Sequence, residues 1–264
     1  MPQVGYGDGV YVVKLHNTAT LGHNVAATTM QDQFIVPFAS RLMKVQYIGD
    51  GVVGTTSPTC DIYKNTASTM SAATSIAADN TVYEGTLATG TSSNVVKPGG
   101  VAVAADDILS LRCVTHAADG HLAHATAILT LKSVTPWVGN RFFVQKISAP
   151  ATTLGNNVAL TTEQGFDIIP GECELILAKF VSDNITANAT MAAYINGTIK
   201  TNDVTIAADD TVYTATMVPP VPAGLNNAKR HGCKCKTGDI ASLRCYTDGT
   251  GDNVTPSATL VYLY

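Results

Sequence analysis

Three imidazole groups lie close together in one short segment of the sequence. His116, His121 and His124 fall within nine residues, with Asp119 between them. Imidazole and carboxylate groups at this spacing are chemically able to bind a transition metal. The spacing matches no established metal-site signature, however, and the equivalent segment 247–257 of the internal repeat described below has no histidine. We therefore expect an ordinary polar loop here, with no bound metal.

A second cluster combines thiols with positive charge. Cys233 and Cys235 are separated by one residue, whereas zinc-binding cysteines are usually two to four residues apart. His231 is the only other ligand type nearby, so we expect no metal and no other cofactor. The stretch also carries the densest positive charge in the chain, which favours contact with an acidic partner surface, although a solvated basic loop is the alternative. The four cations are Lys229, Arg230, Lys234 and Lys236.

Some titratable residues recur in both halves of the chain and are the first candidates for catalysis. They are the pairs Asp79 and Asp209, Asp107 and Asp239, and Arg112 and Arg244. The aspartates precede expected strands, where a carboxylate commonly caps the local backbone. The arginines are expected on an outer sheet face, solvated or paired with a neighbour. The sequence shows no Ser-His-Asp set, paired-carboxylate pattern or phosphate-binding loop. We therefore predict that the protein is not an enzyme.

The recurring residues belong to an internal duplication. Three blocks return in the same order, about 130–133 residues further along, and such a period is too long for a solenoid unit, so each copy is a domain. The blocks beginning at Thr20, Ile76 and Asp107 return at Thr153, Ile206 and Asp239. The sequence thus predicts a first domain over residues 1–134, including an N-terminal arm, and a second over residues 135–264.

Each copy has the pattern of short strands separated by turns. Leu109, Leu111 and Cys113 alternate with polar Ser110 and Arg112, as expected for a strand with one buried face. About eight such strands are expected in each copy, which is the number in a jelly roll. Helical signals are weak throughout. The predicted fold class is all-β, with two tandem homologous β-sandwich (jelly-roll-like) domains.

Composition limits the possible partners. Charged residues make up 14% of the chain, against about 25% in a typical soluble protein, and the net charge is −4. No basic arm opens the sequence, so we expect no nucleic-acid binding. No apolar stretch reaches the roughly 18–20 residues that would cross a bilayer, and no signal peptide is visible. We expect no membrane contact.

A weakly charged surface of this kind is expected to bind a partner through apolar and main-chain contacts rather than ion pairs. The arm at the N-terminus is apolar and is a candidate for adding to a neighbour's sheet edge. The alternative is that it forms the first strand of its own domain, as the matching segment 142–145 does. The divergent segments 87–104 and 217–236 are further candidates. The arm residues selected are Tyr6, Val10, Tyr11, Val12 and Val13.

In architecture and composition the duplicated, Thr- and Ala-rich chain resembles virion proteins of tailed bacteriophages, and most nearly the capsid decoration or cement proteins. The resemblance covers the whole chain and rests on the repeated blocks, not on a diagnostic motif. It implies a structural virion protein, assembled in the host cytoplasm, that binds a major capsid protein or another virion protein. It also implies a homo-oligomer, with a trimer favoured. The alternatives are a receptor- or carbohydrate-binding tail or fibre module, and a jelly-roll capsid shell protein.

Overall fold

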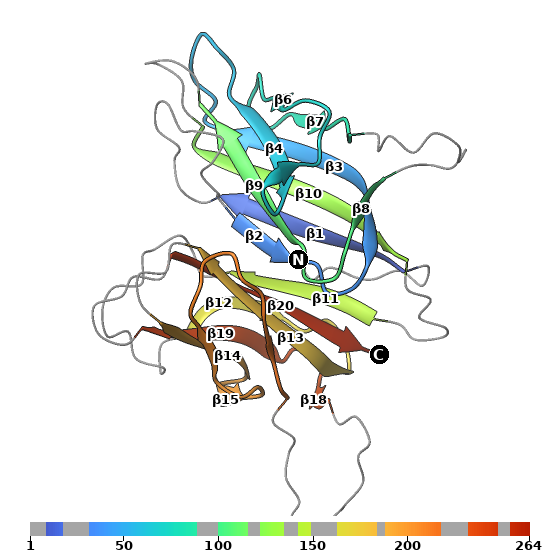
Figure 1. Cartoon of the computed structure of the whole chain (residues 1–264), viewed down its shortest axis with the longest axis vertical. Coiled ribbons are helices and arrows are strands. Elements are labelled where there is room, and N and C mark those ends of the chain that lie inside the picture. Colours follow the sequence, from blue (N-terminus) through green and yellow to red (C-terminus); the bar gives the residue numbers. More distant parts are fainter. Residues whose placement is uncertain are drawn as a thin grey trace, which may run out of the picture. The chain divides into compact units, whose positions relative to one another are not determined.

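The computed structural model describes residues 9–17, 32–88, 100–115, 122–134, 142–148, 163–183, 188–217, 232–247 and 254–264. Regular structure in these ranges is β-strand, and no helix among them is long and apolar enough to cross a membrane. The described residues fall into two compact units, one over 9–134 and one over 142–264, and each is described by itself (Figure 1). Residues 135–141 lie outside the described ranges, so the domain boundary after residue 134 stays a prediction.

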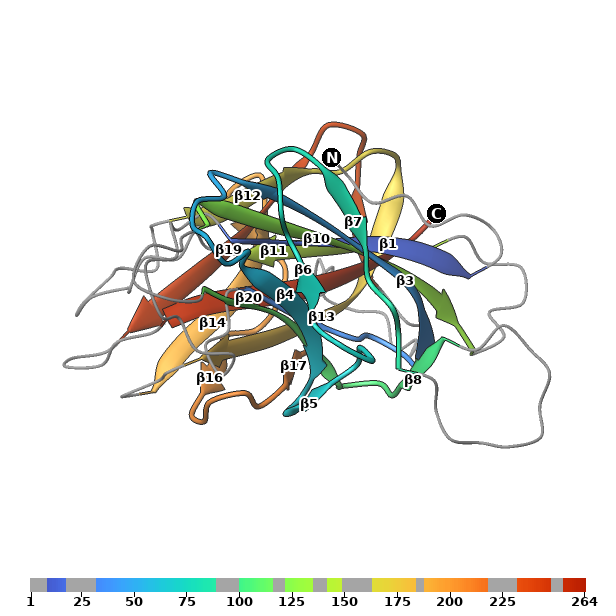
Figure 2. The same cartoon turned by 90° about the horizontal axis from the view of Figure 1, so that it is seen from above.

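The first unit contains two antiparallel sheets. Its first sheet has the order β1 (Val10–Asn17), β10 (His124–Ser133), β3 (Ser40–Asp50) and β7 (Val82–Glu84), with β8 (Val101–Val103) also paired to β3. Its second sheet has the order β2 (Asp32–Ile35), β9 (Ile108–Val114), β4 (Thr59–Lys64) and β5 (Ala67–Ser68), with β6 (Thr74–Ser75) also paired to β4. One edge of each sheet is therefore formed by two short segments in place of one strand (Figure 2).

The second unit repeats this topology strand for strand. Its first sheet has the order β11 (Phe142–Ser148), β20 (Val254–Leu263), β13 (Cys173–Asp183) and β17 (Tyr213–Ala215), with β18 (Cys233–Cys235) also paired to β13. Its second sheet has the order β12 (Glu163–Ile168), β19 (Ile240–Thr247), β14 (Ala189–Ile195) and β15 (Thr198–Ile199), with β16 (Val204–Ile206) also paired to β14. If each divided edge is counted as one strand, a unit has eight strands in two sheets, as in a jelly roll. The predicted fold class is confirmed.

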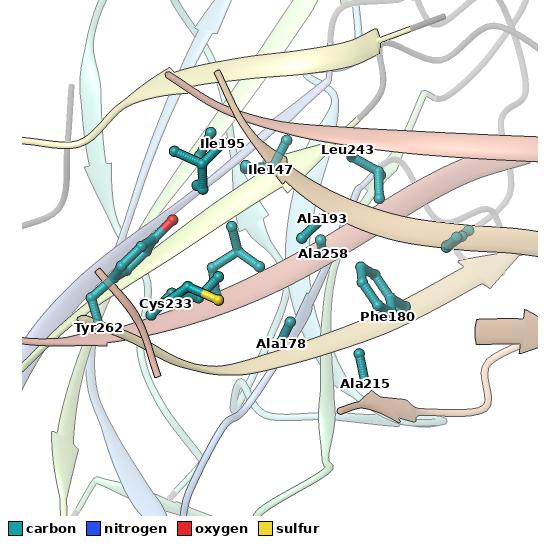
Figure 3. Packing of buried hydrophobic residues seen from close by; sticks show 14 of the residues in the cluster. Ile147, Ala178, Phe180, Ala193, Ile195, Ala215, Cys233, Leu243, Ala258 and Tyr262 are labelled. Carbon is teal, nitrogen blue, oxygen red and sulfur yellow. The ribbon is translucent and has the colours of Figure 1, made fainter. Parts of the chain in front are cut away.

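Alternating apolar residues from the two sheets of each unit fill its interior. In β9, Leu109, Leu111 and Cys113 are fully buried, as predicted, but Ser110 and Arg112 on the other face are buried as well, so the expectation of a single buried face is wrong for this strand. In the second unit, Phe180 and Leu243 come from opposite sheets and lie in one buried cluster (Figure 3). Because the interior of each sandwich is packed with such side chains, contacts with other molecules fall on the outer sheet faces and the loops.

Irregular backbone features recur at equivalent places in the two units and support their common origin. A β-bulge places one extra residue on the third strand of each first sheet, namely Met43 in β3 and Ile176 in β13. Three pairs of turn residues have positive φ, a conformation that Asn, Asp and Gly tolerate best. They are Asn65 and Asn196 (54° and 50°), Asn80 and Asp210 (52° and 51°), and Asp106 and Gly238 (69° and 87°).

One equivalent pair of core residues leads to a stability prediction. Tyr47 in β3 and Phe180 in β13 occupy the same position and are both buried, opposite Ala127 and Ala258. Burial raises the pKa of Tyr47 far above its usual range, and its hydroxyl has no hydrogen-bond partner among the described residues. A buried polar group without a partner is destabilising. We expect Tyr47→Phe to raise the free energy of unfolding by about 1 kcal/mol, measured by urea denaturation.

The reciprocal substitution provides the control. Phe180→Tyr places a hydroxyl in the same apolar environment of the second unit, so it should lower the free energy of unfolding by about 1–3 kcal/mol. If both substitutions shift stability in the same direction, the hydroxyl of Tyr47 is not the destabilising group.

Candidate functional site

One of the recurring aspartates, Asp107, forms hydrogen bonds in the turn before β9. We call this aspartate, the asparagine that it binds and their hydrogen bonds to the backbone the clamp. In the first unit, the Asp107 carboxylate accepts hydrogen bonds from the Ala104 amide (2.7 Å) and from the side-chain amide of Asn65 (2.9 Å). The Asn65 side-chain oxygen accepts the amide of Ile108 at 2.8 Å. The clamp therefore satisfies main-chain donors in a turn, as the sequence predicts for Asp107.

The second unit contains the same clamp. The Asp239 carboxylate accepts the Lys236 amide and the Asn196 side-chain amide, both at 2.7 Å, and Asn196 accepts the amide of Ile240 at 2.8 Å. Asp79 has a similar role elsewhere, because its carboxylate accepts the Val52 amide at 2.6 Å. For these three aspartates the hydrogen bonds go to local backbone and turn residues, which is a structural role.

The clamp gives a pH prediction. The hydrogen bond from the Lys236 amide, followed by that from Asn196, lowers the pKa of Asp239 below its usual value. A lowered folded-state pKa stabilises the fold above the unfolded-state pKa of about 3.9, and this stabilisation is lost as the pH falls through the folded-state pKa. We expect Asp239→Ala to lower the free energy of unfolding by about 1–2 kcal/mol at pH 7 and by less at pH 3. Urea denaturation at both pH values measures this.

Asp203 supplies the control for this prediction. It lies in the same unit and is exposed, and its backbone oxygen, not its carboxylate, accepts a hydrogen bond from Asn202. Asp203→Ala should leave stability nearly unchanged at both pH values. An equal loss at pH 7 and pH 3 for Asp239→Ala would contradict the role assigned to the ionised carboxylate.

The recurring arginines pack on tyrosine rings, which corresponds to the expected alternative of pairing with a neighbour, and not to a solvated side chain. The Arg112 guanidinium carbon lies 4.3 Å from the Tyr63 ring centroid, and the side chain is only 8% exposed. In the second unit Arg244 lies 3.9 Å from the Tyr194 ring centroid. Alternation along β9 correctly places the side chains of Arg112 and Leu111 on different faces of the sheet. It does not predict that the Tyr63 ring covers Arg112. These cation–π contacts are a structural use of both arginines.

The basic segment selected from the sequence is only partly described. Lys234 in β18 and Lys236 after it are exposed, and Lys234 lies opposite Glu174 of β13. Lys229, Arg230 and His231 lie outside the described residues. The binding of an acidic partner by this segment stays a prediction.

The N-terminal residues selected as a binding arm form strand β1, at the edge of the first sheet. Tyr11 and Val13 are fully buried in the core of the first unit, and the Tyr11 hydroxyl lies 2.8 Å from the Ser40 hydroxyl. Their side chains therefore contact their own domain and are not available to a partner, which corrects the expectation for these two residues. Val10 and Val12 are half-buried, and Tyr6 lies outside the described residues.

The histidine and cysteine clusters do not form a metal site in the described part of the chain. There, no group of three or more His, Cys, Asp and Glu side chains is arranged to hold an ion. His124 lies 3.7 Å from Asp50, and its ring is parallel to that of His16. His116 and His121 fall outside the described ranges.

An exposed apolar patch lies on the outer face of the β12–β19 sheet, and the sequence analysis did not identify it. We call Phe166, Ile168 and Ile240 the apolar patch; their side chains are 64%, 57% and 43% exposed. Ile168 lies directly opposite Ile240, and Phe166 lies two residues before Ile168 on the same face. A bulge at Gly165, whose φ is 58°, sets the direction of Phe166.

Asp167 lies between Phe166 and Ile168 in β12, so its side chain points to the opposite face of the sheet from the apolar patch. The equivalent positions in the first unit are Gln33, Ile35 and Ile108, which are all buried, so the repeat does not predict that these positions are exposed in the second unit. The three residues are contiguous only through strand register, and contiguous exposed apolar side chains are a common feature of interaction surfaces.

A basic face covers the outer side of the β1–β10–β3 sheet in the first unit. Its members come from three strands and are brought together by register, since Lys132 lies opposite Arg41, and Lys14 lies opposite Ile128. Ile128 is 38% exposed, and Lys44 is 3.8 Å from Glu84. We call Lys14, Arg41, Lys44, Ile128 and Lys132 the basic face. Its net charge is positive.

No family model and no curated protein matches the chain. Among solved structures, the chain is similar to the major capsid protein P2 from bacteriophage PM2, at 11% identity, 96% coverage of this chain, 97% of that chain and a TM-score of 0.27. It is similar to the STIV MCP at 11% identity, 97% and 96% coverage and a TM-score of 0.27. It is also similar to PNGF-II at 8% identity, 96% and 65% coverage and a TM-score of 0.32.

Proposed function

We propose that the chain is a structural subunit of a virion and that tandem jelly rolls of neighbouring chains pack together to form its protein shell. The observation that carries this proposal is the apolar patch, an exposed hydrophobic surface on a jelly roll whose own interior is already filled. Jelly rolls serve as capsid domains and also as lectins and cupins. The patch favours the first of these, because it provides a surface for association with another protein.

A second copy of the same chain is the proposed occupant of the apolar patch. The basic face has an exposed apolar residue, Ile128, among lysine and arginine side chains, and the chain as a whole carries a net charge of −4. Apolar burial would supply most of the binding free energy, and the charges would orient the two chains. Because the patch and the basic face are different surfaces, the contact is head-to-tail. Such contacts close into rings when the rotation permits, and a trimer is the ring we favour.

Decoration of a pre-existing shell is the second candidate function, carried by the low charge of the surface. A decoration protein would use the same apolar patch against a different major capsid protein. The two functions differ in whether the chain assembles alone. A tail or fibre module would differ from both in being present in few copies.

The test combines assembly of the purified chain with its copy number in particles. Light scattering and electron microscopy of the isolated chain should show rings or shells, and quantitative mass spectrometry of particles should give hundreds of copies. A chain that remains monomeric alone, but binds added particles in hundreds of copies, supports decoration. A handful of copies per particle, or absence from particles, would overturn the shell proposal.

A further inference from the structure

Two pairs of cysteines face each other across antiparallel strands. In the first unit Cys60 of β4 lies directly opposite Cys113 of β9, and in the second unit Cys173 of β13 lies directly opposite Cys235 of β18. The thiols within each pair are hydrogen-bonded, and none of the four is in a disulfide. Residues directly opposite in such a pair have Cα atoms about 4.5–5.5 Å apart, which is within the range that a disulfide bridges.

The two pairs of cysteines differ in how far solvent reaches their thiols. Cys60 and Cys113 are 1% and 0% exposed, so reagents do not reach them in the folded chain. Cys173 is half-buried, and its side chain packs at the margin of the core cluster that contains Cys235. Cys235 is itself only 4% exposed, so a reagent reaches this pair past Cys173, and the first pair has no such partly exposed member.

We propose that Cys173 and Cys235 form a modification site, a dithiol that a hydroperoxide oxidises to a cross-strand disulfide. The inference goes beyond the proposed function and does not depend on it. It applies to the folded chain, whatever the chain assembles with. The dithiol occurs only in the second copy, because the first has Ser40 and Val103 at the two equivalent positions.

The reaction proceeds in two steps that balance. The Cys235 thiolate attacks one oxygen of hydrogen peroxide, the O–O bond breaks, and a sulfenic acid and hydroxide form. The Cys173 thiol then attacks the Cys235 sulfur, the S–S bond forms, and the sulfenic oxygen leaves as water. The two thiols lose two electrons and two protons, and the peroxide is reduced to two molecules of water.

The contact between the thiols favours these assignments. The hydrogen bond that Cys173 donates lowers the pKa of Cys235, and the same bond raises the pKa of Cys173. Cys235 is therefore the better source of thiolate, which is the nucleophilic form. Cys173 is left to act as the resolving thiol.

The disulfide would fix a short strand. β18 has three residues, and among the described strands it pairs only with β13. A covalent bond between Cys235 and Cys173 closes a long loop, which restricts the unfolded chain more than the folded one. The second unit should therefore become more resistant to heat after oxidation.

The experiment exposes the reduced, folded full-length chain to hydrogen peroxide, blocks remaining thiols, and analyses unreduced peptides by mass spectrometry. We expect a Cys173–Cys235 linked peptide, two hydrogens lighter than the reduced pair, before any Cys60–Cys113 link. We also expect a rise in Tm of about 5–10 °C that dithiothreitol reverses. Cys173→Ser and Cys235→Val, which introduce the residues of the first copy, should fold and should each abolish both effects.

Cys245 provides the matched control, because it is buried in the same unit and faces Met191 in place of a thiol. Cys245→Ser should leave the Cys173–Cys235 link in place. Three results would overturn the proposal: sulfenic or sulfinic acid on Cys173 or Cys235 without a link, a Cys60–Cys113 link formed equally fast, or no linked peptide under conditions where Cys173 reacts with an alkylating reagent.

Discussion

Replacing Phe166 by serine is expected to weaken self-association of the chain about 30-fold or more. Phe166 is 64% exposed in the single chain, and burying a phenyl group of this size at an interface contributes about 2–4 kcal/mol. A loss of 2 kcal/mol corresponds to roughly a 30-fold rise in Kd. The effect should be the largest of any single surface substitution, because Phe166 is the only aromatic member of the apolar patch.

The measurement is the concentration dependence of mass by light scattering or analytical ultracentrifugation. Val53 supplies the matched control, since it is an apolar side chain between β3 and β4 of the first unit with an exposure of 48%. Val53→Ser should assemble like the parent chain, and neither substitution should lower the Tm of the dissociated chain. Parent-like assembly by Phe166→Ser would show that the patch is not the contact between chains.

Replacing Phe143 by alanine is expected to lower the free energy of unfolding by about 3–5 kcal/mol. Phe143 is fully buried in β11 and stacks on Tyr262, with ring centroids 4.4 Å apart and an angle of 3° between the planes. Tyr264 contributes a third ring, at 5.3 Å from Phe143. Alanine removes this stacking and leaves a cavity in close-packed surroundings.

Urea denaturation followed by tyrosine fluorescence or circular dichroism measures the loss. Phe143→Leu keeps most of the volume and should cost less than half as much as alanine. If alanine costs under 1 kcal/mol, the ring is not packed as described. The matching position in the first unit is Tyr11, whose ring lies 5.5 Å from Phe38, so both copies place an aromatic ring at this point of the first strand.

The sequence supports the prediction of the fold because the fold depends on local pattern and on repetition. Alternation in β9 and β19 places Leu111 and Leu243 in their cores, and the repeated blocks place equivalent turns in both units. The carboxylates of Asp107 and Asp239 could be assigned to turns because capping is also a local effect. Each of these inferences requires only residues that are near one another in the sequence or in the repeat.

The interaction surfaces could not be predicted in this way, because they depend on strand register. The apolar patch combines Phe166 and Ile168 with Ile240, which belongs to a distant strand. The basic face combines cations from three strands, and none of them belongs to a run of positive charge in the sequence. The search for consecutive charge selected Lys234 and Lys236 instead. Similarly, Arg112 of β9 packs on Tyr63 of the neighbouring strand β4. The alternation of residues along one strand cannot predict a contact with another strand.

The two units have the same strand order, so each strand could pair, while the chain folds, either with its own partner or with the equivalent strand of the other unit. β9 is able to form main-chain hydrogen bonds with β14 as well as with its own partner β4, since the backbone geometry is the same in both units. Side chains must therefore distinguish the two pairings. Cys60 and Ile62 of β4 correspond to Met191 and Ala193 of β14, so a large residue stands in each copy where the other has a smaller one. A strand paired in the wrong unit would leave a cavity at one position and a steric clash at another. The sequence difference between the two copies therefore disfavours mispairing.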